Sequence, residues 1–153
     1  MSFILVDEIL EFEKGKSIVA VKNVSVLKYF FVDHIIYGTI LPSTLVAEAV
    51  AQAAGWLVTA SLDFQKRGLL IDLGMLDFGG IVRPGDQLVL EAELLSLREE
   101  AAVLTGRARV DGRLVGKVDS GLCLLVDAGA LDDVEKTRSM FAALMKQRFS
   151  RVI

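Results

Sequence analysis

Alternation of apolar and polar residues predicts strands on both sides of one long apolar segment. Before that segment, residues 3–12 and 17–26 alternate around a turn at residues 13–16, which predicts a hairpin, although residues 3–6 also fit a helical turn. After it, alternating runs separated by turn residues predict four further strands. These are residues 69–78, 87–97, 102–110 and 114–126.

The apolar segment itself predicts a helix preceded by a loop over residues 28–42. Pro42 suits the position before a helix, because its ring fixes φ and it lacks an N–H. Ser43 or Thr44 is then expected to cap a helix that ends near Arg67 and Gly68. One long helix beside one antiparallel sheet predicts an α+β domain in which the sheet wraps the helix.

A membrane span is the alternative interpretation of this segment. Residues 35–62 carry a single charge over 28 positions, which is long enough to cross a bilayer. However, Glu48 and Gln52 fall near the centre, where an ionised carboxylate is costly. Basic residues do not flank the run until Lys66 and Arg67. A buried central helix is therefore favoured, with Glu48 expected to be buried and to need a partner or a function.

Length and composition narrow the class of protein. A chain of 153 residues is expected to form one domain, and a mean hydropathy of +0.51 indicates apolar surface that an oligomer would bury. The net charge of −3 argues against nucleic-acid binding, and one cysteine with one histidine excludes the usual zinc patterns. Cys123 lies in an apolar run and is interpreted as a core residue rather than a nucleophile. The N-terminus lacks the features of a signal peptide, so a cytoplasmic location is expected.

Residues 127–153 differ in character from the domain expected over residues 1–126. Asp132 and Glu135 have the spacing of a helix start, and an apolar stripe at helical spacing follows. The stripe consists of Met140, Phe141, Leu144, Met145 and Phe149. From residue 136 onward there are five basic residues and no acidic ones, whereas the first 135 residues carry 12 basic and 20 acidic. The two interpretations are a basic amphipathic helix packed on the domain and a contact for an acidic partner or an anionic membrane surface.

The apolar segment also contains a candidate acid/base pair. His34, the only histidine, precedes the helix, and Glu48 lies in its second turn, with Gln52 and Trp56 following at i+4 spacing. Imidazole titrates near neutral pH, and a carboxyl group desolvated among apolar residues holds its proton to higher pH. The pair therefore has the properties of a general base and a general acid, with a purely structural role for both as the alternative.

Residues 30–52, FFVDHIIYGTILPSTLVAEAVAQ, resemble the active-site segment of the bacterial 3-hydroxyacyl-[acyl carrier protein] dehydratases of the Z type, F-F-x-G-H-F-P-x-x-P-x-M-P-G-x-L-x-x-E-A-x-A-Q. The positions in register are Phe30, Phe31, His34, Pro42, Leu45, Glu48, Ala49, Ala51 and Gln52. The flanks LVDEILEFEKGKSIVAVKNVSV and IVRPGDQLVLEAELL resemble the opening hairpin and a later sheet segment of that family. The resemblance covers about residues 3–126, and the tail after Asp127 lies outside it.

This resemblance implies a hot-dog fold, in which a long helix is wrapped by an antiparallel sheet, and a dimer, often assembled into hexamers. It implies reversible dehydration of (3R)-3-hydroxyacyl thioesters carried by acyl carrier protein, without a metal or redox cofactor. His34 from one subunit would be the base and Glu48 from the other the acid. The backbone N–H of Ser43 would stabilise the enolate oxygen, and Gln52 would orient Glu48. Glu rather than Asp at position 48 favours the branch that dehydrates without isomerising the double bond.

The loop before the helix departs from the family pattern. Asp33 and Thr39 replace a glycine and a proline, residues 35–36 replace Phe-Pro, and Ser43 replaces a glycine. These changes predict a divergent member that acts on another acyl chain. Asp33 would either raise the pKa of the His34 imidazole or face solvent.

Roles are also predicted for other residues of the segment and its surroundings. Tyr37 and Pro42 are candidates for substrate binding, and for Tyr37 a packing role is the alternative. Trp56 and Phe78 are interpreted as core rather than tunnel residues. Arg83, Pro84 and Asp86 are interpreted as a turn.

Two other functions fit the same fold. One is a hot-dog thioesterase, in which a carboxylate activates water, and the other is a non-catalytic subunit that binds acyl thioesters. An acidic carrier protein would be attracted by basic surface, for which Lys66, Arg67 and the tail are the candidates.

Overall fold

A computed structural model describes residues 5–24, 31–34, 36–72, 74–130 and 133–152; for residues 34, 75, 76, 130 and 146–152 it describes the backbone alone. Expectations on residues 3–4, 25–30, 35 and 132 thus lie outside the described residues. The elements are β1 (Glu8–Glu13), β2 (Ser17–Asn23), β3 (Val32–His34), β4 (Gly38–Ile40), α1 (Ser43–Ser61), β5 (Lys66–Asp72), β6 (Met75–Asp77), β7 (Gln87–Leu97), β8 (Ala101–Val110), β9 (Arg113–Asp127), η2 (Ala128–Ala130) and α2 (Val134–Val152).

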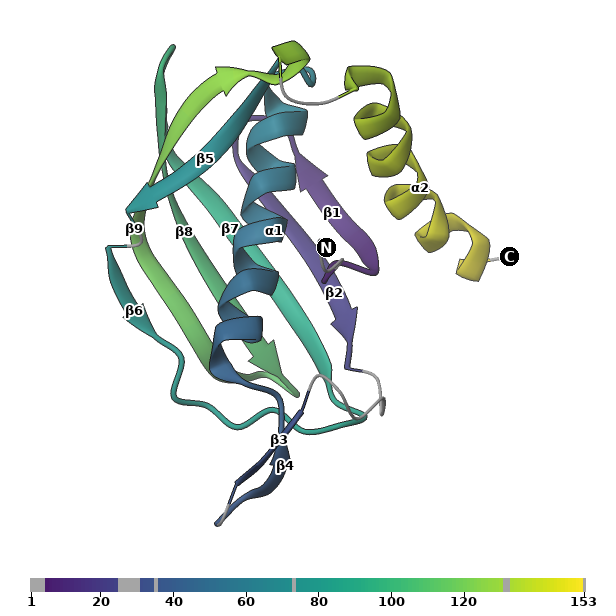
Figure 1. The fold of residues 1–153 in the computed structure, drawn as a ribbon. Coiled ribbons are helices and arrows are strands. Elements are labelled where there is room, and N and C mark those ends of the chain that lie inside the picture. The colour runs from purple at the N-terminus through teal and green to yellow at the C-terminus, as the bar shows by residue number, and fades with distance from the viewer. Residues whose placement is uncertain (1–4, 25–30, 35, 73, 131–132, 153) are drawn as a thin grey trace.

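The main sheet has the order β1-β2-β7-β8-β9-β5, and β6 also pairs with β9. All of its strand pairs are antiparallel. One face of this sheet packs against α1, which lies over it (Figure 1). The α+β architecture that the sequence predicts is therefore confirmed.

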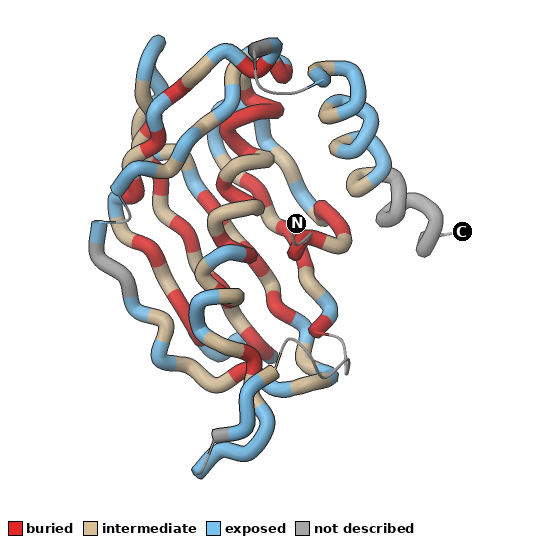
Figure 2. The backbone as a smooth tube through the Cα atoms, in the orientation of Figure 1, coloured by how far each residue is buried: buried red, intermediate tan, exposed pale blue. Residues whose placement is uncertain are grey.

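The core lies between α1 and the sheet. Buried positions recur at helical spacing along α1 and at every second residue of the central strands (Figure 2). The buried apolar residues of α1 are Val46, Ala49, Val50, Ala53, Ala54, Leu57, Val58 and Ala60. Several are alanines, which let the helix approach the strands. At Gly106 of β8, an added Cβ would lie 2.5 Å from Cγ1 of Val50, so the close approach of α1 requires glycine there.

The end of α1 differs from the prediction. The helix stops at Ser61 rather than near Arg67, because Asp63 and Phe64 adopt left-handed backbone conformations with φ of 54° and 64°. The N–H of Phe64 donates to the Thr59 carbonyl at 2.9 Å, and its ring is buried. The following residues form β5, whose pairing with β9 satisfies their backbone groups.

Further boundaries differ from those that the sequence predicts. The strands of the first hairpin are shorter than expected, since β1 begins at Glu8 rather than at residue 3 and β2 ends at Asn23 rather than at residue 26. Residues 69–78 divide between β5 and β6 rather than forming one strand. The described part of the predicted loop contains the short β3–β4 hairpin. Pro42 itself is the N-cap of α1, without a side-chain capping bond, so the expected cap by Ser43 or Thr44 is wrong.

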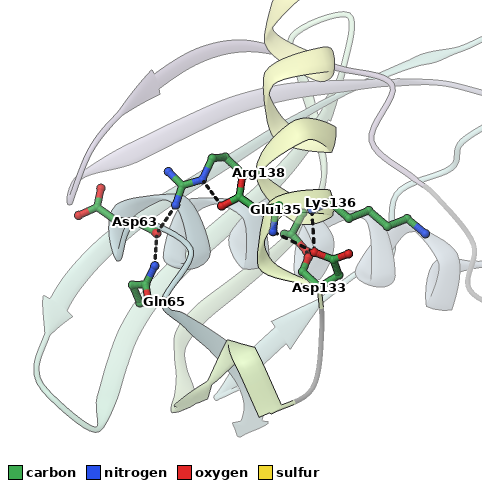
Figure 3. Close-up of polar contacts among 7 residues, drawn as sticks. Asp63, Gln65, Asp133, Glu135, Lys136 and Arg138 are labelled. Carbon is green, nitrogen blue, oxygen red and sulfur yellow. Dashed lines mark hydrogen bonds and ion pairs between the residues drawn. The ribbon is translucent and has the colours of Figure 1, made fainter.

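The tail forms α2, which packs beside α1 and over β1 (Figure 1). Asp133 Oδ1 accepts hydrogen bonds from the N–H groups of Glu135 and Lys136 at 3.1 and 3.2 Å, so Asp133 caps this helix (Figure 3). Arg138 donates to the Asp63 carbonyl at 3.3 Å, and its guanidinium lies 5.0 Å from the centre of the Phe64 ring. The structure thus favours the interpretation of α2 as a helix packed on the domain.

An aromatic cluster joins α2 to the rest of the domain. The Phe141 ring lies 5.2 Å from Phe12 of β1, 5.8 Å from Trp56 of α1 and 5.5 Å from Phe64, measured between ring centres. The first and last pairs meet edge to face, which is a favourable geometry for aromatic rings. Trp56 is partly buried and packs against the core, which agrees with its interpretation as a packing residue.

Candidate active site

The first turn of α1 presents backbone donors at the surface. Pro42 has φ −56° and ψ 138°, and its carbonyl accepts hydrogen bonds from the N–H groups of Leu45 and Val46 at 3.0 and 3.3 Å. Ser43 and Thr44 are exposed, and their N–H groups belong to the part of a helix that has no intrahelical acceptor. The N-terminal end of the helix dipole adds to the attraction for negative charge there.

Glu48 lies in the next turn of α1 and is connected to the N-terminal segment through Gln52. Gln52 Nε2 donates to Glu48 Oε1 at 3.4 Å, and Gln52 Oε1 accepts a hydrogen bond from the N–H of Leu5 at 2.8 Å. The expectation that Glu48 is buried is wrong for the single chain, because Glu48 lies off the sheet-facing stripe of α1 and is exposed. The contact with Gln52 restricts the carboxylate to one side of the helix.

Substituting Gln52 by Met is expected to lower the free energy of unfolding by about 1–2 kcal/mol, because the buried N–H of Leu5 loses its acceptor. Chemical denaturation followed by circular dichroism measures this loss. Gln65→Met is the matched control, since Gln65 is exposed and its side-chain amide donates to the Asp63 carbonyl at 3.3 Å. Equal stability of the Gln52 variant and wild type would contradict the expectation.

His34 lies on the hairpin formed by β3 and β4. Its backbone pairs with Gly38, whose φ of +73° is readily adopted by glycine. Two of the positions that depart from the family pattern, Asp33 and Thr39, are cross-strand partners in this hairpin. Thr39 Oγ1 donates to Asp33 Oδ1 at 3.0 Å. The exposed Asp33 carboxylate therefore has a partner within the hairpin.

The remaining candidates are divided between the two ends of α1. Tyr37 is exposed near the hairpin turn and its carbonyl accepts a hydrogen bond from Arg83 Nη1, while the half-buried Pro42 joins the hairpin to α1. Lys66 and Arg67 begin β5 near the C-terminal end of α1 (Figure 1). A helix of 19 residues is about 28 Å long, so this end lies far from Ser43. Within one chain, these two basic residues are far from the candidate site.

The structure thus brings Glu48 and Gln52 into contact and places Ser43 in the preceding turn. The hairpin that carries His34 extends beyond the N-terminal end of α1 (Figure 1). Sequence reasoning missed the Leu5 N–H and the guanidinium of Arg83. The motif Arg-Pro-Gly-Asp indicates a turn but contains no signal for a contact with a residue 46 positions away.

The described part of the chain also bears on a metal site, on the thiol of Cys123 and on the possibility of a membrane span. Within it, no three His, Cys, Asp or Glu residues are grouped so that they could hold a metal ion. Cys123 is buried, and desolvation raises the pKa of its thiol, which suits a core residue. Among the described residues, no helix combines the length and apolar content that crossing a membrane requires.

Comparison with known proteins identifies the class of the fold and then the family. The PaaI protein of E. coli has the same fold with a TM-score of 0.64, at 12% identity and covering 78% of each chain. Residues 1–119 match the model of the FabA-like domain. The 3-hydroxyacyl-[acyl-carrier-protein] dehydratase FabZ of Thiobacillus denitrificans is 40% identical over 125 residues, covering 76% of this chain and 83% of the relative. The FabZ of Pectobacterium atrosepticum is 43% identical over 115 residues, with coverage of 73% and 76%.

The fold is therefore the hot-dog fold that the resemblance implies. The chain belongs to the FabA-like family, among whose members it is similar to the FabZ dehydratases. The matched region ends within β9, so α2 lies outside it.

Proposed function

We propose that the protein is a hydro-lyase that reversibly dehydrates (3R)-3-hydroxyacyl thioesters of acyl carrier protein to trans-2-enoyl thioesters in fatty-acid biosynthesis. The observation that carries this proposal is the 40–43% identity to FabZ dehydratases over about three quarters of the chain. The position of Glu48, beside Gln52 and in the turn after the exposed Ser43, supports it.

In the proposed mechanism, His34 removes a proton from the carbon next to the thioester carbonyl. The electron pair moves toward the carbonyl oxygen, and the N–H of Ser43 stabilises the developing negative charge with help from the helix dipole. Glu48 then protonates the departing hydroxyl group, so water leaves and the double bond forms. Gln52 orients Glu48, and Tyr37 and Pro42 contact the acyl thioester.

We further propose that a second copy of the chain completes the site. Glu48 is exposed in the single chain, and the hairpin segment of His34 exposes apolar side chains. These are Val32, Ile36 and Tyr37, which are 48%, 76% and 44% exposed. A homodimer, alone or as three dimers in a hexamer, would cover this apolar surface and desolvate Glu48. The enzyme would work in the cytoplasm on acyl carrier protein thioesters.

The test is hydration of a short trans-2-enoyl thioester, which removes the conjugated chromophore. We expect the absorbance to fall without release of free thiol, because dehydration is reversible and leaves the thioester bond intact. A thiol reagent in a parallel sample measures thioester cleavage. Release of thiol would instead identify a thioesterase. Binding of the acylated carrier without turnover would identify a non-catalytic subunit.

A further inference from the structure

The hairpin that carries His34 has a contact with a distant turn. The side chain of Arg83 donates a hydrogen bond through Nη1 to the backbone carbonyl of Tyr37, close to the hairpin turn. At the base of the hairpin, the N–H of Leu41 donates to the carbonyl of Val82 at 2.8 Å. The segment 82–83 is therefore bonded to the hairpin at two points, one at its base and one near its tip.

The turn that holds Arg83 is itself bonded to the main sheet. Asp86 Oδ2 accepts the N–H of Arg83 at 2.8 Å, and the N–H of Asp86 donates to the Arg83 carbonyl at 3.1 Å. Just after β2, Val24 exchanges backbone hydrogen bonds with this turn, accepting from Gly85 at 2.9 Å and donating to Asp86 at 2.8 Å. The backbone of Arg83 is therefore held next to the main sheet, and its side chain reaches the β3–β4 hairpin.

The described part of the hairpin is short and exposed. Each strand has three residues, and its segment is mostly exposed from Val32 to Thr39 among the described side chains. Isolated two-stranded hairpins are marginally stable in water. Within the hairpin, the bond between Thr39 and Asp33 fixes the cross-strand pair next to the pair of His34 and Gly38. The orientation of the hairpin relative to α1 needs a further restraint, and Arg83 supplies one.

We propose that Arg83 is a positioning residue for His34. By holding the Tyr37 carbonyl, its guanidinium fixes the direction in which the β3–β4 hairpin leaves the domain, and thereby the placement of the His34 backbone. The bond between Thr39 and Asp33 transmits this restraint across the hairpin. The inference rests on the proposed function only in naming what His34 does. It assigns to Arg83 a role that the turn motif alone does not predict.

The kinetic test compares Arg83→Met, Arg83→Lys and wild type on a short enoyl thioester that carries no carrier protein. Met keeps the apolar stem and removes the donor, whereas Lys keeps a donor and a charge. We expect Arg83→Met to lower kcat between about tenfold and a hundredfold with little change in KM, since small misplacements of a catalytic group have effects of this size. Arg83→Lys is expected to recover part of the loss.

Arg113→Met is the matched control. Arg113 is also exposed, and its guanidinium donates to the carbonyl of Ile81 at 3.5 Å, in the segment that precedes Arg83 rather than in the hairpin. We expect this variant to keep the wild-type kcat within about twofold. An equal loss of kcat in the Arg83 and Arg113 variants would mean that removing any nearby positive charge lowers activity. This result would overturn the proposal.

A spectroscopic readout separates positioning from activity. His34 is the only histidine, so a histidine-labelled sample gives the signals of one imidazole by NMR. We expect Arg83→Met to shift and broaden the His34 ring signals, Arg113→Met to leave them unchanged, and Thr39→Val to change them in the same direction as Arg83→Met. Ring signals at the wild-type position in Arg83→Met, together with wild-type kcat, would overturn the proposal. If wild type itself hydrates no enoyl thioester, the proposed function fails, while the NMR comparison still decides whether Arg83 positions His34.

Discussion

Replacing Glu48 by Gln, or His34 by Ala, is expected to lower the hydration rate of an enoyl thioester by about a thousandfold or more. General acid and base groups contribute effects of this size, and each variant removes one proton-transferring group. The Gln side chain has nearly the shape of Glu but cannot donate the carboxyl proton. The measurement is the loss of the enoyl chromophore over time at fixed enzyme concentration.

The control for these variants is Glu93→Gln, because Glu93 is likewise exposed but lies on β7. It should keep wild-type activity, and the Glu48→Gln and Glu93→Gln variants should keep the wild-type unfolding midpoint within a few degrees, since exposed substitutions have small effects on stability. Residual activity above about a tenth of wild type in Glu48→Gln would contradict the assignment of the acid.

The same two variants test whether one site draws on two subunits. When inactive Glu48→Gln and His34→Ala chains are unfolded, mixed in equal amounts and refolded, half of the dimers combine one chain of each kind. Each mixed dimer then contains one site with both groups intact, so about a quarter of wild-type activity should return. Absence of recovery in mixed dimers would place both groups of a site in one chain.

Replacing Phe141 by Ala is expected to lower the free energy of unfolding by about 2–3 kcal/mol. The half-buried Phe141 ring contacts three aromatic rings, those of Phe12, Trp56 and Phe64, so its loss leaves a space that α2 cannot fill with alanine. Trp56 is the only tryptophan, and its fluorescence in a denaturant titration reports on this cluster directly. The emission of the folded variant is also expected to move toward that of exposed tryptophan.

Met140→Ala is the control for this substitution, because Met140 precedes Phe141 on α2 but is 39% exposed. Its expected loss is below about 0.5 kcal/mol. Equal stability of the two variants would mean that α2 contributes little to the domain through its aromatic contacts. In that case the interpretation of α2 as a helix for an outside partner would regain support.

The sequence by itself determined the architecture and the candidate residues. Periodicity of two located β7 at residues 87–97 as observed, and placed β8 and β9 within one residue at each end, because one face of each strand packs against α1. Pro42 marked the start of α1 because proline suits only the first positions of a helix. The order of His34 and Glu48 along the chain, with the flanking segments, indicated the family that the comparisons confirm.

Only the tertiary structure determined the features that depend on contacts between residues distant in the sequence. The end of α1 at Ser61 follows from the left-handed turn at residues 63–64 and from the pairing of β5 with β9, which no helical period encodes. The bonds from Gln52 to Leu5 and from Arg83 to Tyr37 join residues 47 and 46 positions apart. A sequence pattern records the preference of each segment for helix, strand or turn. Which groups of two segments meet depends on the packing of the whole domain, and that packing sets the position of Glu48 and of the hairpin that carries His34.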